Sequence, residues 1–305
     1  MPMIFRRWFV AATLLSCLCL AWTADAPAHG DTQQNSEHED TVRLAVIGAS
    51  ASAGFGIVVE IENEAATPDA PNVPRTVKRM ISLIDLIDAA DQQDRIIEFD
   101  LSSHMFFTRP FEYGRSSVDR TLSWKPDVVF AVDFLFWYVF GNRSEETRLD
   151  SLRKGLSELE RLATTGVSLV VGTVPDLEGI DSPMISEEQI ARSETVTEAN
   201  RRIKDWAKTH PNVVVAPIFE LSRTLNEGGP IRIGRHQWDP DRDGLELIAP
   251  DKLHPTYEGL ICIAQAIDVE LRTLANERER FPTLDLDRSK VMELMRVRPE
   301  VSQTP

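Results

Sequence analysis

Residues 48–54 read GASASAG and follow directly on an apolar run, VRLAVI, at residues 42–47. Small residues let a backbone turn sharply and let another molecule approach it closely. Serine adds a hydroxyl group, which becomes a nucleophile only when a base lies beside it. The stretch therefore predicts a turn at the end of a buried strand that presents a reactive serine, provided that the rest of the chain supplies the base.

Strand-like and helix-like segments alternate along the chain from residue 42 onwards. The strand candidates are β-branched and almost continuously apolar, as in strands covered on both faces, and they span residues 42–48, 95–101, 127–133, 167–174 and 212–217. Amphipathic runs that predict helices lie between and after them, at residues 76–90, 145–163, 193–209 and 256–274. This alternation predicts an α/β fold, a single three-layer domain in which helices flank a central parallel sheet. In such sheets the site lies beyond the carboxyl ends of the strands, where residues 48–54 fall.

The N-terminus has the pattern of a secretory signal peptide. Arg6-Arg7 precede an apolar run at residues 8–22, and small residues end in Ala24-Asp25-Ala26, so we expect residues 1–26 to be cleaved. The apolar run is shorter than the roughly 20 residues that a membrane-spanning helix needs. An uncleaved anchor is the alternative, and a lipoprotein signal is less favoured because apolar residues continue past Cys17. The sequence thus predicts a secreted or periplasmic protein.

The remaining chain divides into a polar linker at residues 27–41, one domain at residues 42–276 and a charged, proline-punctuated tail at residues 277–305. Cleavage of the signal peptide leaves Cys262 without a partner cysteine, so we expect a buried, unreactive thiol and no intramolecular disulfide. The 48 acidic residues outnumber the 33 basic ones and give a formal net charge of −15. Such a charge would repel a polyanion, so we expect no nucleic-acid partner.

The sequence DKLHPTYEG at residues 251–259 supplies the base that the serine needs. His254 can take the proton of a serine hydroxyl through Nε2, and Asp251, three residues earlier, can accept the Nδ1–H bond and so fix the tautomer. Of the two serines in GASASAG we expect Ser50 to be the nucleophile, because it follows the strand immediately. Ser52 is then expected to be a capping or packing residue.

These two blocks resemble those of the SGNH, or GDSL-type, hydrolases. Gly48-Ala49-Ser50 with Gly54 is similar to the family's G-D-S-x-x-x-G block, and residues 251–255 match its D-x-x-H-P block. An α/β-hydrolase is the nearest alternative, but there the acid usually lies well before the histidine in sequence. The resemblance implies an esterase that cleaves ester-linked acyl or acetyl groups through Ser50, His254 and Asp251, with no cofactor. Its substrate would be a small-molecule, carbohydrate or lipid ester.

The same resemblance implies an oxyanion hole that this sequence alters. Its donors would be the N–H of Ser50, the N–H at Ser103, where the family usually has glycine, and the side chain at Asp133, where it has asparagine. Ser103 keeps its backbone N–H, but an ionised Asp133 cannot donate, and losing one donor costs about 10²–10³ in rate in tested enzymes. Asp133 could be protonated, another donor such as Asn142 or residues 102–109 could replace it, or the match to the family's block could be shifted by a residue or two. Alternatively, Asp133 could only cap the strand end or form a salt bridge there.

Two further functions therefore remain open at this stage. An acyltransferase would use the same residues and replace water with a sugar hydroxyl as the acyl acceptor. A binding protein of the same fold without catalytic activity would explain Asp133.

Two other motifs carry weaker expectations. The stretch WDPDRDG at residues 238–244 reproduces the first half of a calcium loop through Asp239, Asp241 and Asp243, but Pro250 stands where the closing glutamate should be. We therefore expect an Asx-rich turn and no metal site. The aromatic runs at residues 105–107 and 134–138 could line an acyl pocket, although core packing is the favoured interpretation.

Overall fold

The computed structural model describes residues 41–63, 69, 74–227, 229–275 and 277–297. The predicted signal peptide, residues 1–26, and nearly all of the linker predicted at residues 27–41 lie outside this part of the chain. In the part that is described, no helix combines the length and the apolar character needed to cross a bilayer.

The centre of the fold is a five-stranded sheet in the order β4-β1-β5-β6-β7, and each neighbouring pair of strands is parallel. The strands are β1 (Val42–Val46), β4 (Ile96–Asp100), β5 (Val128–Ala131), β6 (Ser168–Gly172) and β7 (Val213–Ala216). Each lies inside one of the five predicted segments, so the predicted α/β fold with a central parallel sheet is confirmed.

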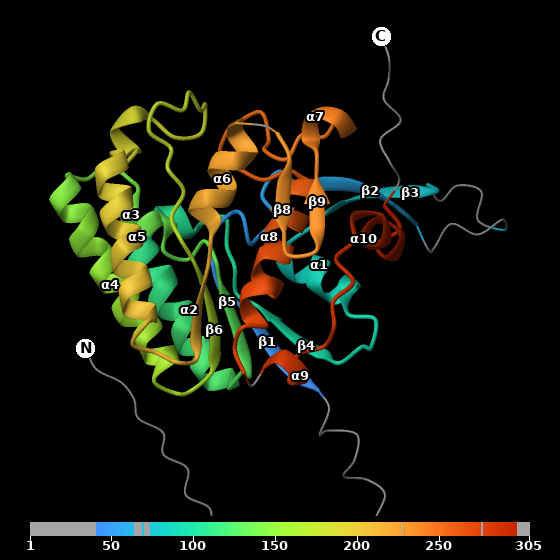
Figure 1. Cartoon of the computed structure of the whole chain (residues 1–305), viewed down its shortest axis with the longest axis horizontal. Coiled ribbons are helices and arrows are strands. Elements are labelled where there is room, and N and C mark those ends of the chain that lie inside the picture. Colours follow the sequence, from blue (N-terminus) through green and yellow to red (C-terminus); the bar gives the residue numbers. More distant parts are fainter. Residues whose placement is uncertain (1–40, 64–68, 70–73, 228, 276, 298–305) are drawn as a thin grey trace, which may run out of the picture. The chain divides into compact units, whose positions relative to one another are not determined.

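The sheet has an apolar core on each face. Along β1 the side chains alternate, because successive residues of a strand point to opposite faces. Leu44 and Val46 belong to one core, with α1 (Leu83–Ala90), α8 (Tyr257–Leu271) and α10 (Arg288–Leu294). Ala45 and Ile47 belong to the other, with α2 (Pro110–Trp124), α3 (Phe136–Val139), α4 (Glu145–Ala163) and α5 (Ser193–Ala207). Figure 1 shows these two groups of helices on opposite sides of the sheet.

One predicted helix is wrong. Residues 76–90 form a strand and then a helix: β3 (Thr76–Met80) pairs antiparallel with β2 (Val58–Glu62), and α1 begins only at Leu83. Ser82 separates the two elements because its side chain and that of Asp85 form a capping box, which satisfies backbone N–H groups at the start of α1.

The described part of the predicted tail, residues 277–297, packs into the core. Phe281, Leu284, Leu286 and Val291 are each at most 2% exposed, and they join the core that α1 and α8 cover. Asp285 also donates its backbone N–H to the carbonyl oxygen of Ala90, at the end of α1. These apolar residues lie singly between charged residues and prolines, so the sequence showed no periodic pattern that would have placed them inside.

Several elements were not predicted. Besides β2, α2, α3 and α10, these are η1 (Phe106–Thr108), which lies between β4 and α2, and short elements after the fourth predicted strand: η2 (Glu187–Gln189), α6 (Ile218–Glu227), β8 (Ile231–Ile233), β9 (His236–Trp238), α7 (Pro240–Asp243) and α9 (Glu277–Arg280). The calcium-like stretch lies at α7, where the Asp239 side chain accepts the N–H of Arg242 as a helix cap. Among the described residues, no three His, Cys, Asp or Glu side chains converge as metal ligands would.

Candidate active site

The GASASAG stretch forms a tight turn at the carboxyl end of β1. Ala53 donates its N–H to the carbonyl oxygen of Ala49 over 3.0 Å, and Phe55 donates to that of Ser50 over 2.9 Å. Gly54 has a φ of +71°, and an added Cβ would lie 1.9 Å from the carbonyl oxygen of Ile81. Glycine is therefore required at position 54 both by the backbone conformation and by the close approach of the chain before α1.

The loop that carries His254 is folded back on itself before α8. Ala249 donates its N–H to the carbonyl oxygen of His254 over 2.8 Å, and Thr256 donates to that of Leu247 over 3.1 Å. Lys252 takes a left-handed conformation, with a φ of 59°, at the turn. Thr256 then caps α8 by accepting the N–H of Gly259. This folding fixes His254 two residues before the helix cap, where it is 5% exposed.

Ser50, His254 and Asp251, which the sequence predicted as a triad, lie in one chain of hydrogen bonds. Nε2 of His254 is 2.9 Å from Oγ of Ser50, and Nδ1 of His254 is 2.7 Å from Oδ2 of Asp251. Oδ1 of Asp251 accepts the backbone N–H groups of His254 and Leu253. Burial raises the pKa of Asp251, but these hydrogen bonds outweigh it, and the pKa lies below its ordinary value of 3.8. An ionised Asp251 can therefore orient the imidazole ring and stabilise it once protonated.

Phe55 is a site residue that the sequence did not reveal. Its ring centroid lies 4.7 Å from that of the His254 imidazole, at an interplanar angle of 41°. The same turn that presents Ser50 therefore also packs an aromatic ring against the partner of Ser50. The sequence offered no signal for this contact, because Phe55 and His254 lie at opposite ends of the fold in sequence.

The carboxylate of Asp133 holds the Ser50 turn in place. Its Oδ1 accepts the N–H of Ala49 and the hydroxyl of Ser52, and its Oδ2 accepts the N–H groups of Ala51 and Ser52, at distances of 2.7–3.1 Å. A Cβ at Gly48 would lie 2.1 Å from Oδ1, so only glycine admits the carboxylate. Four donors converge on two oxygens, which suits a carboxylate without a proton. Of the alternatives that the sequence left open for Asp133, these hydrogen bonds favour a structural role at the strand end.

Of the other predicted oxyanion donors, the structure leaves one available. The N–H of Ser103 already donates to the carbonyl oxygen of Gly48 over 3.0 Å, because the chain after β4 runs beside the Ser50 turn. The N–H of Ser50 has no hydrogen-bond partner among the described residues. Neither Asn142 nor any residue of 102–109 is among the described residues that line the cleft beside Ser50.

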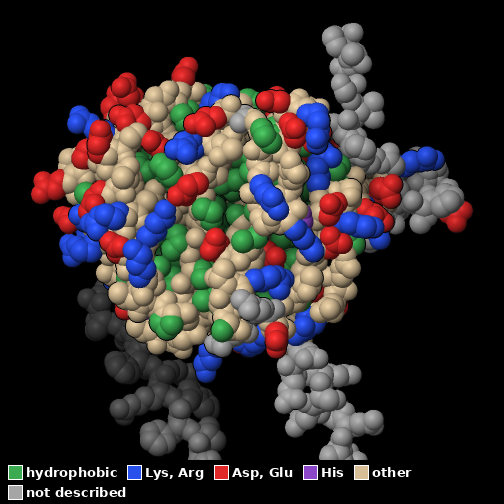
Figure 2. Space-filling model, in the orientation of Figure 1, with side chains coloured by type: hydrophobic (Ala, Val, Ile, Leu, Met, Phe, Trp, Pro, Cys, Tyr) green, Lys and Arg blue, Asp and Glu red, His purple; other side chains and the backbone are tan. Residues whose placement is uncertain are grey.

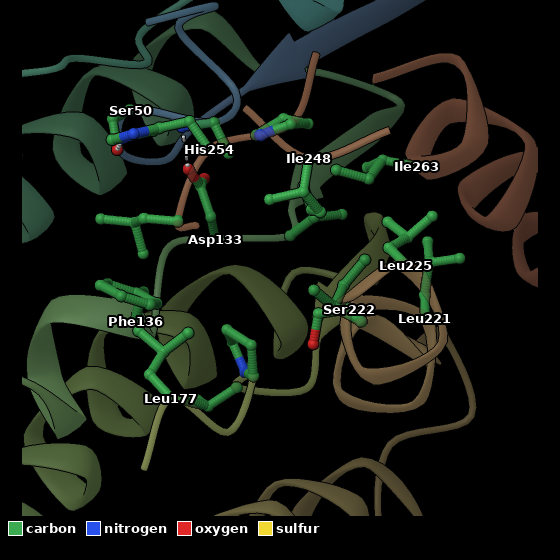
Figure 3. A pocket seen from close by; sticks show the side chains of 18 of the residues that line it. Ser50, Asp133, Phe136, Leu177, Leu221, Ser222, Leu225, Ile248, His254 and Ile263 are labelled. Carbon is green, nitrogen blue, oxygen red and sulfur yellow. Dashed lines mark hydrogen bonds between the residues drawn. The ribbon is translucent and has the colours of Figure 1, made fainter. Parts of the chain in front are cut away.

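That cleft is open and mainly apolar, and it lies at the carboxyl ends of the strands. Ser50 and His254 lie at one end of it, as Figure 3 shows. Phe136 and Leu177 lie on one side, and Leu221, Ser222 and Leu225 from α6 lie on the other. Of the predicted aromatic runs, Phe136 lines the cleft, whereas Phe106, Phe134 and Tyr138 are buried in the core. The site thus joins a serine–histidine–aspartate arrangement to an open, mainly apolar cleft.

Comparison with known proteins gives similar structures but no similar sequences. No protein-family model and no curated protein match the chain. Similar solved structures include the acetylxylan esterase Axe2 of Geobacillus stearothermophilus, at 15% identity and a TM-score of 0.46, over 75% of this chain and 94% of that one. A GDSL-like lipase of Parabacteroides merdae is similar at 13% identity and a TM-score of 0.48, over 77% and 96% of the two chains.

The role of Asp133 predicts that Asp133→Asn lowers both stability and any activity of Ser50. An amide keeps one acceptor oxygen and turns an N–H₂ group towards two donors, so the turn loses hydrogen bonds to a charged group. We expect the free energy of unfolding to fall by about 1.5–3 kcal/mol, measured by urea denaturation.

Asp100→Asn is the matched control. Asp100 also ends a strand of the sheet, but it accepts both of its hydrogen bonds, from the N–H and the hydroxyl of Ser102, through Oδ1 alone. An asparagine can keep both, so we expect a loss of less than about 1 kcal/mol. Faster ester hydrolysis by Asp133→Asn would contradict the structural role and place residue 133 at the oxyanion.

Proposed function

We propose that the protein is a serine ester hydrolase of the SGNH type. The observation that carries the proposal is the continuous hydrogen-bonded chain from Asp251 through His254 to Ser50, at the end of an apolar cleft. Nucleophile and base lie within hydrogen-bond distance, and a third group orients the base, which is the arrangement that activates a serine. The fold places all three groups beyond the carboxyl ends of parallel strands, where sites of α/β proteins lie.

The geometry supports a two-step reaction. Oγ of Ser50 attacks the ester carbonyl carbon while Nε2 of His254 takes the hydroxyl proton, and Asp251 stabilises the imidazolium that forms. The N–H of Ser50, which has no hydrogen-bond partner among the described residues, would donate to the oxyanion. The imidazolium then gives its proton to the departing alkoxide, which leaves as an alcohol. In the second step His254 takes a proton from water and the resulting hydroxide attacks the acyl carbon on Ser50. The bond between Oγ of Ser50 and the acyl carbon then breaks, the imidazolium returns its proton to Oγ, and the acid is released.

The second candidate function is a binding protein without catalytic activity. It is favoured by one observation, namely that Asp133 and Ser103 are both committed to bonds within the fold, so that two of the three expected oxyanion donors are not available. Such a protein would use the same apolar cleft and would not form a covalent intermediate.

Covalent labelling separates the two functions. A fluorophosphonate reagent should label wild-type protein at Ser50, detected by peptide mass spectrometry, and Ser50→Ala should abolish the labelling. Hydrolysis of p-nitrophenyl esters should fall by about 10⁴- to 10⁶-fold in the same variant, because the nucleophile is lost.

Ser157→Ala is the control for this substitution, since Ser157 lies on α4 with its hydroxyl bonded to the carbonyl oxygen of Arg153. It should keep wild-type labelling and activity. A wild-type protein that binds esters without being labelled would favour the binding function, and turnover by Ser50→Ala would exclude the proposed mechanism.

The pH dependence should report one protonation. His254 acts as a base only when neutral, so kcat/KM should fall as the pH is lowered through the range of about 8 to 5 in which histidines take up a proton. Because hydrogen bonds hold the pKa of Asp251 below its ordinary value, that carboxylate stays ionised throughout this range and adds no second step to it. Circular dichroism at each pH should confirm that the protein stays folded. A rate independent of pH between 5 and 8 would remove His254 from the mechanism.

We further propose that the protein is exported. The support is the basic start, the short apolar run and the small-residue site at Ala24-Asp25-Ala26. N-terminal sequencing of protein expressed in a bacterial host should give a mature chain that begins near Pro27. An intact N-terminus on protein that stays in the cytoplasm would contradict export.

A further inference from the structure

Helix α6 presents one apolar stripe to the cleft beside Ser50. The cleft is lined by its residues Ile218, Leu221, Ser222, Leu225 and Asn226, which are spaced as i, i+3, i+4, i+7 and i+8 and so share one helix face. The opposite face carries Glu220, Arg223 and Glu227, which are exposed and form ion pairs with Lys204 or with each other. Only Leu221 of this helix is fully buried. The helix therefore forms a wall of the cleft. Its apolar residues pack against the core and would gain further contacts when the cleft is occupied.

The facing wall is apolar and held rigidly. Phe136 stacks on Phe140 at a centroid distance of 4.4 Å and meets Trp137 edge-on at 4.9 Å, so its ring cannot swing out of the cleft without breaking an aromatic cluster. Leu177, 2% exposed, comes from the segment after β6. Figure 3 shows Phe136 and Leu177 across the cleft from Leu221 and Leu225, with Ile248 and Ile263 nearer His254.

The uncharged polar groups of this cleft are mostly used within the fold. The hydroxyl of Thr173 accepts the N–H of Phe219, and the hydroxyl of Ser222 donates to the carbonyl oxygen of Phe219. The side-chain amide of Asn226 donates to the carbonyl oxygen of Ser222. Both oxygens of Asp133 are committed to the Ser50 turn. Lys252, at the rim, is exposed. A sugar residue in the cleft would lose hydrogen bonds to water and find few replacements, which disfavours it.

From this lining we propose that the cleft is an acyl-binding site, selective for esters of saturated acyl chains several carbons long over acetyl esters. The inference rests on the proposed ester hydrolysis. During that reaction the acyl group stays attached to Ser50 while the alcohol must leave. An apolar cleft that begins at Ser50 suits the acyl group, which stays bound to the serine. The exposed rim suits the alcohol, which leaves. Figure 2 shows hydrophobic side chains between charged ones near the middle of the face that carries α6.

The test is a chain-length series of p-nitrophenyl acetate, butyrate, hexanoate and octanoate. Each methylene that enters the cleft should raise kcat/KM by about fourfold, as expected for the burial of one CH₂ group, until the cleft is full. Leu225→Trp should fill the cleft and remove most of this gain, so that the rate on octanoate falls much more than the rate on acetate. Leu225→Ala, which removes wall contacts without adding bulk, should lower the rate on octanoate more than that on acetate.

Arg223→Trp is the matched control, because it adds the same side chain to the outer face of the same helix. It should leave the whole chain-length series unchanged. Acetate as the best substrate, or equal losses on all esters in Leu225→Trp, would overturn the acyl site. An increase of kcat/KM with the chain length of the alcohol, in a series of alkyl acetates, would overturn it too, since the cleft would then hold the leaving group. If wild-type protein shows neither turnover nor fluorophosphonate labelling at Ser50, the proposed ester hydrolysis itself is rejected. If Ser50 is labelled but kcat/KM does not change with acyl chain length, only the acyl-binding site is rejected.

Discussion

The candidate site depends on one carboxylate, that of Asp133. It lies at the carboxyl end of β5 and accepts four hydrogen bonds from residues 49–52, which follow the neighbouring strand β1. This interaction fixes where the turn begins relative to the sheet, and so it fixes the position of Ser50. Gly48 is required because the carboxylate occupies the space of a side chain there. A group that the family resemblance would assign to stabilising a charge in the reaction thus serves to hold the nucleophile.

His254 reaches Ser50 through a second, independent set of constraints. The loop before α8 is closed by its own backbone hydrogen bonds, and α8 is one of the most deeply buried helices, with Cys262 inside it. Burial raises the pKa of the Cys262 thiol, which keeps it protonated and unreactive. The base is therefore attached to the core on one face of the sheet, while Ser50 is tied to β5. Their meeting at 2.9 Å follows from the rigidity of both supports.

The cleft explains how such a site could select its ligand without many polar groups. Its walls come from the segments after β5, β6 and β7 and from the loop of His254, which are distant in sequence and meet only because parallel strands end at the same edge. Apolar walls gain free energy in proportion to the apolar surface that a ligand removes from water. Selectivity in this cleft would thus depend on size and shape, set by Phe136 on one side and α6 on the other.

The sequence by itself determined the order of the strands along the chain, the parallel sheet and the pairing of Ser50 with Asp251 and His254, because these follow from local hydrophobic patterns and short motifs. It could not show that residues 76–90 change from strand to helix at Ser82, since both halves carry apolar residues. Nor could it place Phe281, Leu284 and Val291 in the core, because they have no common period. The roles of Asp133, Ser103, Phe55 and α6 were decided only by the tertiary structure. Each of these roles depends on a contact between residues that are far apart in the sequence, such as Phe55 with His254 or Asp133 with Ala49. Packing between helices and strands decides which of these residues meet.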